Sequence, residues 1–74
     1  MKEEDLTIED QYFLEVAVKE LAKAVDAQTK GRRALGQQHL REALMFRTKL
    51  PREFTDDQFD KEYDRTYSLL YRGY

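Results

Sequence analysis

Residues 50–59 read LPREFTDDQF, and this stretch separates two predicted helices. Pro51 disfavours helical dihedral angles at the residue before it, so the preceding helix is expected to end near residue 49. Upstream of this point apolar residues recur at helical spacing, which predicts a helix over 33–49. The proline therefore sets the C-terminal limit of the second predicted helix.

The same stretch carries a start signal for a third helix, predicted over 56–72. Thr55 is the predicted N-cap, and Gln58 completes a capping box with it. Phe54 and Phe59 stand at the two positions of a hydrophobic staple. Beyond this start, one face of the predicted helix is lined by Phe59, Tyr63, Tyr67, Leu70, Tyr71 and Tyr74.

A first helix is predicted over 8–30, with Thr7 as its N-cap. Gly31 is a plausible end to this helix, because glycine is common just past a helix C-terminus. A single uninterrupted helix over 8–49 stays open as an alternative, since one glycine is a soft break. The apolar stripe expected on the first helix consists of Leu14, Val18, Leu21 and Val25.

The second predicted helix has an apolar arc of about half its circumference, typical of a helix with more than one neighbour. Gly36 weakens a helix, so either the helix begins after it or a close helix contact needs its missing side chain. Arg47 projects into the arc, and we expect its guanidinium to be partly buried and paired with a carboxylate. The arc contains Leu35, Gly36, His39, Leu40, Ala43, Leu44, Phe46 and Leu50.

These signals predict an all-α fold, a helical hairpin plus a C-terminal helix in one domain over 1–74, with 1–6 as a disordered lead-in. The chain has 74 residues and no cysteine, and domains this small commonly need a disulfide, a metal or a partner subunit. We therefore expect a homodimer. The residues expected at a core or dimer interface are Leu40, Leu44, Arg47, Tyr63 and Tyr67.

Residues suited to catalysis are scarce. The chain has one histidine, His39, and one serine, Ser68, which are expected on different helices, so no nucleophile and base pair is predicted. His39 is expected to be packed, with its hydrogen bond satisfied. His39 and Glu42 lie one helical turn apart, but two ligands are too few for a metal site. We therefore expect no enzymatic activity, no metal and no cofactor.

Charge is segregated along the chain. Residues 1–28 hold eight acids and three bases, residues 29–52 hold seven bases and one acid, and residues 53–74 hold six acids and three bases. Such segregation can pair helices within the fold, or it can present separate charged surfaces to partners. Both interpretations remain open from the sequence.

Binding of a protein partner is the predicted function. Tyrosine is enriched at binding hot spots, although the C-terminal tyrosines would also suit the roof of a thin core. Spaced carboxylates can occupy a surface lined with lysine and arginine. The residues predicted to bind the partner are Glu9, Tyr12, Glu15, Asp57, Asp60, Asp64 and Tyr71, with Asp10 and Glu20 as further acids on the first helix.

Nucleic-acid binding by the basic segment 29–52 is the alternative prediction. Gln37, Gln38, Arg41 and Lys49 share the polar face of the second predicted helix and could contact phosphates or base edges. The net charge of −2 counts against this alternative, because binding to a phosphate backbone rewards positive charge.

In length, cysteine-free helical build and charge segregation, the whole chain resembles small phage-encoded proteins that disable a host machine. Within that class it is similar to the phage sliding-clamp inhibitors, which sit as a dimer in the DNA channel. The resemblance implies blockade of a host replication protein by carboxylates. Residues 11–14 only approximate the clamp-binding peptide of glutamine-leucine-x-leucine-phenylalanine type, so folded surfaces would have to bind.

No signal peptide is predicted, because residues 1–5 are mostly charged and no apolar stretch follows them. The longest apolar runs, such as 43–46, are far shorter than the ~20 residues of a membrane span. We therefore expect a cytoplasmic protein, in the host cytoplasm if it is phage-encoded, with no membrane partner.

Overall fold

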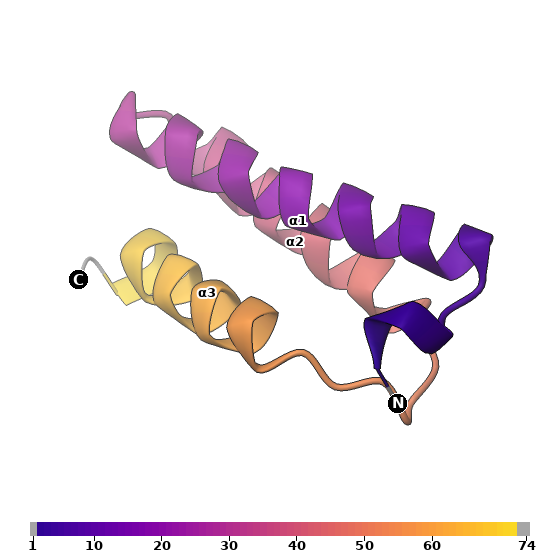
Figure 1. Ribbon diagram of the computed structural model, residues 1–74. Helices are drawn as coiled ribbons and strands as arrows, with labels where there is room; N and C mark the ends of the chain where they lie inside the picture. Colours follow the sequence, from indigo (N-terminus) through magenta and orange to yellow (C-terminus); the bar gives the residue numbers. More distant parts are fainter. Residues whose placement is uncertain (1, 73–74) are drawn as a thin grey trace.

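The computed structural model describes residues 2–72 and shows an all-α domain of three helices, with no strand in that range (Figure 1). The expected helix ranges 8–30, 33–49 and 56–72 differ from the observed bounds by one residue at several ends. The C-terminal helix also changes to π-helical geometry in its last turn. The elements are η1 (Glu3–Asp5, a 3₁₀ turn), α1 (Ile8–Thr29), α2 (Arg33–Thr48), α3 (Asp57–Tyr67) and η2 (Ser68–Arg72, the π-helical turn).

The helices form a hairpin with a third helix laid against it. Figure 1 shows α1 and α2 packed side by side and antiparallel, while α3 runs back along the hairpin in the direction of α1. The molecule is elongated, with extents of 38 × 18 × 14 Å. The α1–α2 interface is much more extensive than either contact with α3, so the hairpin is the framework of the fold.

A Schellman turn at Gly31 separates α1 from α2. Gly31 has a φ of +77°, a left-handed conformation that favours glycine. The Arg32 amide donates to the Ala27 carbonyl at 2.8 Å, and the Gly31 amide donates to the Gln28 carbonyl at 3.0 Å, as this motif requires. The alternative of one uninterrupted helix over 8–49 is therefore wrong.

Small residues line the α1–α2 interface. Ala17, Ala24 and Ala43 are completely buried, which allows the two backbones to approach closely. The buried face of α1 is therefore rotated about the helix axis relative to the predicted stripe. Val18 is 44% exposed, while Ala17 and Ala24 occupy the contact face. The main core cluster contains Ala17, Leu21, Ala24, Leu40, Ala43, Phe59 and Leu70, with Phe46 and Tyr63 packed against it.

Gly36 of α2 lies against both α1 and η2. A Cβ added there would stand 2.7 Å from Leu70 Cδ2 and 3.1 Å from the Ala24 carbonyl oxygen. Because α2 begins at Arg33, Gly36 is inside the helix. The prediction that a close helix contact needs its missing side chain is confirmed.

A second apolar cluster closes the end of the molecule near the N-terminus. Leu6 packs there with Leu14, Leu50 and Phe54, and Phe13 lies against them. Gln11 Nε2 also donates to the Leu6 carbonyl at 3.0 Å. The expectation of a disordered lead-in over 1–6 is therefore wrong for the part that the structure describes, because Leu6 anchors η1 over the loop after α2.

The start of α3 differs from the prediction by one residue. Asp56 is the N-cap, and its Oδ1 accepts from the Phe59 amide at 3.1 Å. Thr55 is exposed and is not the cap. Phe54 and Phe59 are both buried, but they belong to different clusters, so they do not form the predicted staple.

Arg47 joins the two clusters. Its guanidinium carbon lies 5.1 Å from the centroid of the Phe54 ring and 5.8 Å from that of the Phe59 ring. Its Nη2 donates to the Phe54 carbonyl at 3.3 Å, whereas its buried Nε has no hydrogen-bond partner. The partial burial was predicted correctly. A carbonyl and two ring faces hold the guanidinium, however, where a carboxylate was expected.

Replacing Gly36 with alanine is expected to destabilise the protein by up to about 2 kcal/mol, because the new methyl group would crowd Leu70 and the Ala24 carbonyl and overpacking of this kind costs about 1–3 kcal/mol. Helix propensity alone would favour alanine by about 1 kcal/mol. The sign of the change in the free energy of unfolding therefore shows whether packing or propensity dominates at this position. Urea denaturation followed by circular dichroism measures it. Ala34→Gly, at an exposed position of α2, is the control and should lose about 1 kcal/mol. A Gly36→Ala variant more stable than the parent would contradict the close contact.

Replacing Arg47 with methionine should change the free energy of unfolding by less than about 1 kcal/mol, because it fills similar space and removes the unsatisfied Nε. Arg47→Ala should lose about 2–4 kcal/mol, because it leaves a cavity between the Phe54 and Phe59 rings. Both values come from urea denaturation. Equal losses in the two variants would show that the charge itself, and not the volume, is required.

Candidate functional site

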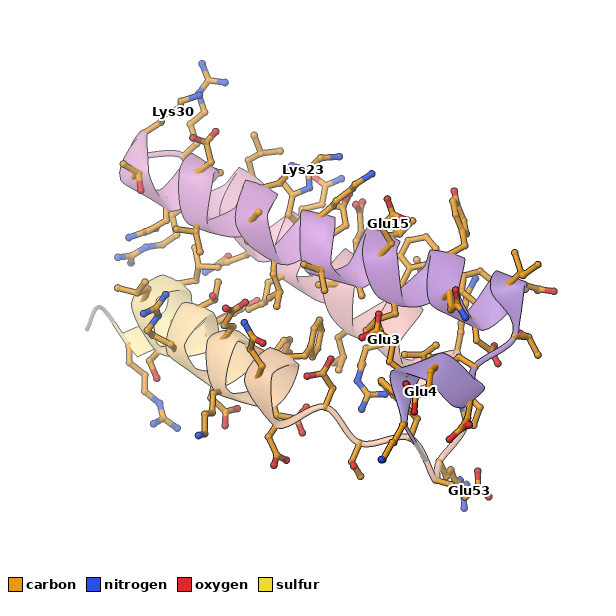
Figure 2. The ribbon with its side chains drawn as sticks, viewed as in Figure 1. Glu3, Glu4, Glu15, Lys23, Lys30 and Glu53 are labelled. Carbon is orange, nitrogen blue, oxygen red and sulfur yellow. The ribbon has the colours of Figure 1, made fainter. Side chains whose placement is uncertain are left out.

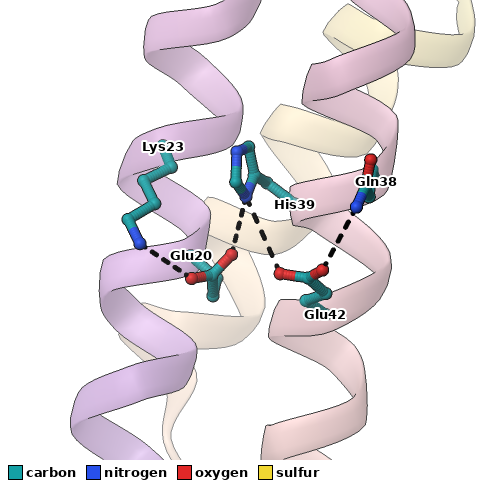
Figure 3. Close-up of polar contacts among 5 residues, drawn as sticks. All are labelled: Glu20, Lys23, Gln38, His39 and Glu42. Atoms are coloured by element: carbon teal, nitrogen blue, oxygen red, sulfur yellow. Dashed lines mark hydrogen bonds and ion pairs between the residues drawn. The ribbon is translucent and has the colours of Figure 1, made fainter.

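A polar cluster interrupts the α1–α2 interface (Figure 3). Glu20 of α1 faces His39 and Glu42 of α2. His39 Nδ1 lies 2.7 Å from Glu20 Oε2 and 3.8 Å from Glu42 Oε2. Glu20 is buried, and the other two residues are half-buried. One ligand atom from each of the three lies within 4.8 Å of the others.

Each carboxylate in this cluster is held by a second partner on its outer oxygen. Lys23 Nζ lies 3.1 Å from Glu20 Oε1. Gln38 Nε2 donates to Glu42 Oε1 over a long 3.5 Å contact. Both Oε2 atoms are left facing the imidazole, as Figure 3 shows. The cluster therefore has two carboxylates that converge on one ring nitrogen.

The environment of Glu20 keeps its carboxyl group ionised. Burial raises the pKa of Glu20, but hydrogen bonds with His39, Lys23 and Glu42 and the positive charge of Lys23 together outweigh it, so that the pKa lies below its ordinary value. A buried charge is tolerated here because donors from two helices surround it. The arrangement can hold a proton or a cation between α1 and α2.

Sequence reasoning missed Glu20, which it placed among the exposed acids of the first helix. It predicted correctly that His39 would be packed with a satisfied hydrogen bond, but it counted only Glu42 as a neighbouring ligand. Glu20 lies three residues from Ala17 and four from Ala24, in the spacing of the contact face. An acid on that face, opposite the single histidine, was the signal that could have revealed the cluster.

A second candidate site is an open groove of about 520 Å³ between α1 and α3, with η1 at one end. Its apolar floor includes Leu14, Val18 and Phe59. Toward the other end of α1 a smaller hollow of about 290 Å³ adjoins the groove and is lined by Val25 and Arg65. The groove exists because α3 packs less closely on α1 than α2 does.

The rim of the groove is acidic. Among the lining residues described, the one base is Lys19, whose Nζ lies 3.0 Å from Glu15 Oε1. Figure 2 labels Glu3 and Glu15, which belong to this rim. The acidic lining residues are Glu3, Glu15, Asp56 and Glu62.

The predicted partner-binding residues do not form one surface. Glu15 lines the groove, whereas Glu9 and Tyr12 are exposed on α1 outside its lining. Asp57, Asp60 and Asp64 are exposed on α3, and they too lie outside the lining. The sequence missed Glu3, Asp56 and Glu62, because only the docking of η1 and α3 against α1 brings them to Glu15.

Tyrosines stack along α3 and η2. The ring centroids of Tyr63 and Tyr67 are 6.4 Å apart, and those of Tyr67 and Tyr71 are 4.6 Å apart. Burial raises the pKa of Tyr63, and the neighbouring Tyr71 and Tyr67 raise it further. Tyr63 packs on the core while Tyr67 and Tyr71 are exposed. Tyr74, predicted to continue the stripe, lies outside the described residues.

The remaining residues predicted for a core or dimer interface also divide into buried and exposed side chains. Leu40 is buried in the core, whereas Leu44 is 43% exposed. Leu35, also in the predicted apolar arc, is exposed as well. The buried part of the arc on α2 is therefore narrower than the sequence predicted, because α3 covers only part of the hairpin.

The basic middle segment has mixed environments. Lys30 pairs with Asp26 at 3.0 Å, and Lys49 Nζ lies 5.1 Å and 5.0 Å from the ring centroids of Phe13 and Phe46. Arg41 is exposed on α2. Only part of the positive charge in 29–52 is thus engaged within the fold.

The chain matches no protein-family model, no curated protein and no solved structure. Within residues 2–72, no helix has the length and apolar character needed to cross a membrane.

Replacing Glu20 with glutamine should lower the free energy of unfolding at pH 7 by about 1–3 kcal/mol, because the buried hydrogen bonds lose their charged acceptor. A carboxyl group with a lowered folded-state pKa stabilises the fold above its unfolded pKa, and this contribution is lost as the pH falls through the folded value. The gap between parent and variant should therefore close toward pH 3. Urea denaturation at both pH values tests this.

Glu15→Gln is the matched control, because the Glu15–Lys19 pair is solvent-exposed and such pairs contribute at most about 1 kcal/mol. A Glu20→Gln variant whose deficit persists unchanged at pH 3 would show that ionisation of Glu20 does not stabilise the fold.

Proposed function

We propose that this protein is a non-enzymatic interaction module that binds a basic surface of a protein partner through the groove between α1 and α3. The observation that carries the proposal is the composition of the groove, an apolar floor with Leu14 and Phe59 beneath four carboxylates. Apolar contact supplies affinity, and the charged rim supplies steering and orientation.

The partner surface that fits this groove presents lysine or arginine side chains around an apolar contact. A long basic side chain can lay its methylene stem on an apolar floor while its charged head meets the acidic rim. Exposed carboxylates also attract such a surface over about 8–10 Å at ordinary ionic strength. The exposed acids Asp57, Asp60 and Asp64 on the outer side of α3 add to the same field.

A DNA-binding surface on a replication protein has this chemistry. The proposal therefore includes blockade of a host sliding clamp, as the resemblance to phage inhibitors implies, with carboxylates occupying the channel that DNA would fill. A homodimer belongs to the same proposal, since Leu44, Tyr67 and Tyr71 are exposed apolar side chains that a second copy would cover.

Nucleic-acid binding by the segment 29–52 is the second candidate. The observation that favours it is the exposure of Arg32, Arg33, Arg41 and Arg52. These four charges would contact phosphates, and reversal of the acidic rim to lysine would strengthen nucleic-acid binding, where it should weaken binding to a basic protein surface.

Two matched charge reversals test which acidic surface binds. Glu15→Lys with Glu62→Lys changes the groove rim, and Asp60→Lys with Asp64→Lys makes the same charge change on the outer side of α3. We expect the rim variant to bind a purified bacterial sliding clamp at least ten-fold more weakly than the outer variant does, by isothermal titration calorimetry. Binding of the parent should also weaken as salt rises.

Circular dichroism and sedimentation equilibrium establish that each variant keeps its helices and its association state. Capture from a bacterial lysate by the parent extends the search if the clamp does not bind. If only the Asp60→Lys, Asp64→Lys variant lost binding, the partner would bind the outer side of α3 and not the groove. Binding to duplex DNA that only Arg41→Glu with Arg33→Glu abolishes would establish the nucleic-acid alternative.

A further inference from the structure

We infer that Glu20, His39 and Glu42 form a binding site for a divalent transition-metal ion of the zinc class, which links α1 to α2. The site would use Oε2 of each carboxylate and Nδ1 of the imidazole. Neutral imidazole with carboxylates is a ligand set that suits zinc and its first-row neighbours.

The spacing of the ligand atoms carries this inference. Four ligands placed tetrahedrally at about 2.0–2.1 Å from zinc stand about 3.4 Å from one another. The distances from His39 Nδ1 to the two carboxylates, 2.7 Å and 3.8 Å, lie on either side of this value. All three ligand atoms lie within 4.8 Å of one another, so small side-chain rotations would bring them to bonding distance.

The outer contacts of the carboxylates match those of ligands in metal sites. Ligating groups are held in orientation by hydrogen bonds to their remaining atoms. Lys23 holds Glu20 by Oε1 and Gln38 holds Glu42 by Oε1, which leaves both Oε2 atoms directed at His39. An ion bound at Nδ1 would take the place of the proton there, the neutral ring would carry its proton on Nε2, and neither outer contact would be disturbed.

Charge and access also fit a cation. Two carboxylates and one lysine leave the site with a net negative charge when the imidazole is neutral. Glu20 has a side chain only 9% exposed, whereas those of His39 and Glu42 are 21% and 38% exposed. The site is thus closed toward the core and open toward solvent, where water would supply the fourth ligand.

The chain permits a direct test, because His39 is its only histidine and cysteine is absent. Untagged protein labelled with ¹⁵N is titrated with Zn²⁺, and the imidazole nitrogens are followed by long-range ¹H–¹⁵N NMR spectra. We expect the Nδ1 signal to report metal binding and the remaining proton to reside on Nε2. Thermal unfolding should show a rise of about 10–20 °C in Tm when free Zn²⁺ is a hundred times Kd. Mg²⁺ should neither change the Nδ1 signal nor raise the Tm, because it prefers octahedral oxygen ligands.

Glu42→Gln is the informative variant, since Glu42 is half-buried and its loss should not unfold the protein. It should weaken Zn²⁺ binding at least ten-fold, as should Glu20→Gln, while the surface control Glu15→Gln keeps the parent affinity. Circular dichroism verifies that each variant is helical. An unchanged His39 spectrum at ten equivalents of Zn²⁺ would overturn the inference. So would an affinity that survives both Glu20→Gln and Glu42→Gln, because His39 would then bind the ion alone.

Discussion

The close approach of α1 and α2 is the constraint on which the rest of the structure depends. Alanine and glycine side chains at the interface, such as Ala17, Ala24 and Gly36, set this distance. Leu70 then fits over Gly36, which fixes where the end of the C-terminal helix docks. A domain with few residues and no disulfide gains stability from this packing, because dense contacts at short range offset part of the entropy lost on folding.

The close packing of α1 and α2 also places two charged side chains, Glu20 and Arg47, partly or wholly in the interior. Glu20 on the contact face of α1 must find donors, and His39 of α2 supplies one across the interface while Lys23 supplies another from α1 itself. Arg47 fills the space between the two apolar clusters with its long side chain and leaves Nε unsatisfied. Both features cost desolvation energy. They differ in what they could bind. The Glu20 cluster has convergent ligand atoms for an ion, whereas Arg47 has only a carbonyl and two ring faces around it.

The less extensive packing of α3 on the hairpin leaves side chains exposed that closer packing would bury. Because α3 covers only part of the hairpin, an acidic groove remains along α1, and apolar residues such as Leu44 and Tyr71 stay exposed. The extensive α1–α2 packing and the open groove beside α3 thus lie against the same helix, α1. The polar cluster lies in the α1–α2 interface, so a bound metal would stabilise the framework without filling the groove.

The sequence by itself determined the class of fold and the break at Pro51, because caps and breakers act on dihedral angles within a few residues. It indicated a helix end at Gly31 but left one continuous helix open, and the structure decided for the turn. It also indicated that Gly36 could mark a close contact and that Arg47 would be partly buried. Only the tertiary structure decided which face of α1 is buried and that Glu20 meets His39. Periodicity fixes the spacing of a face but not its rotation about the helix axis. That rotation depends on contacts between segments far apart in the chain.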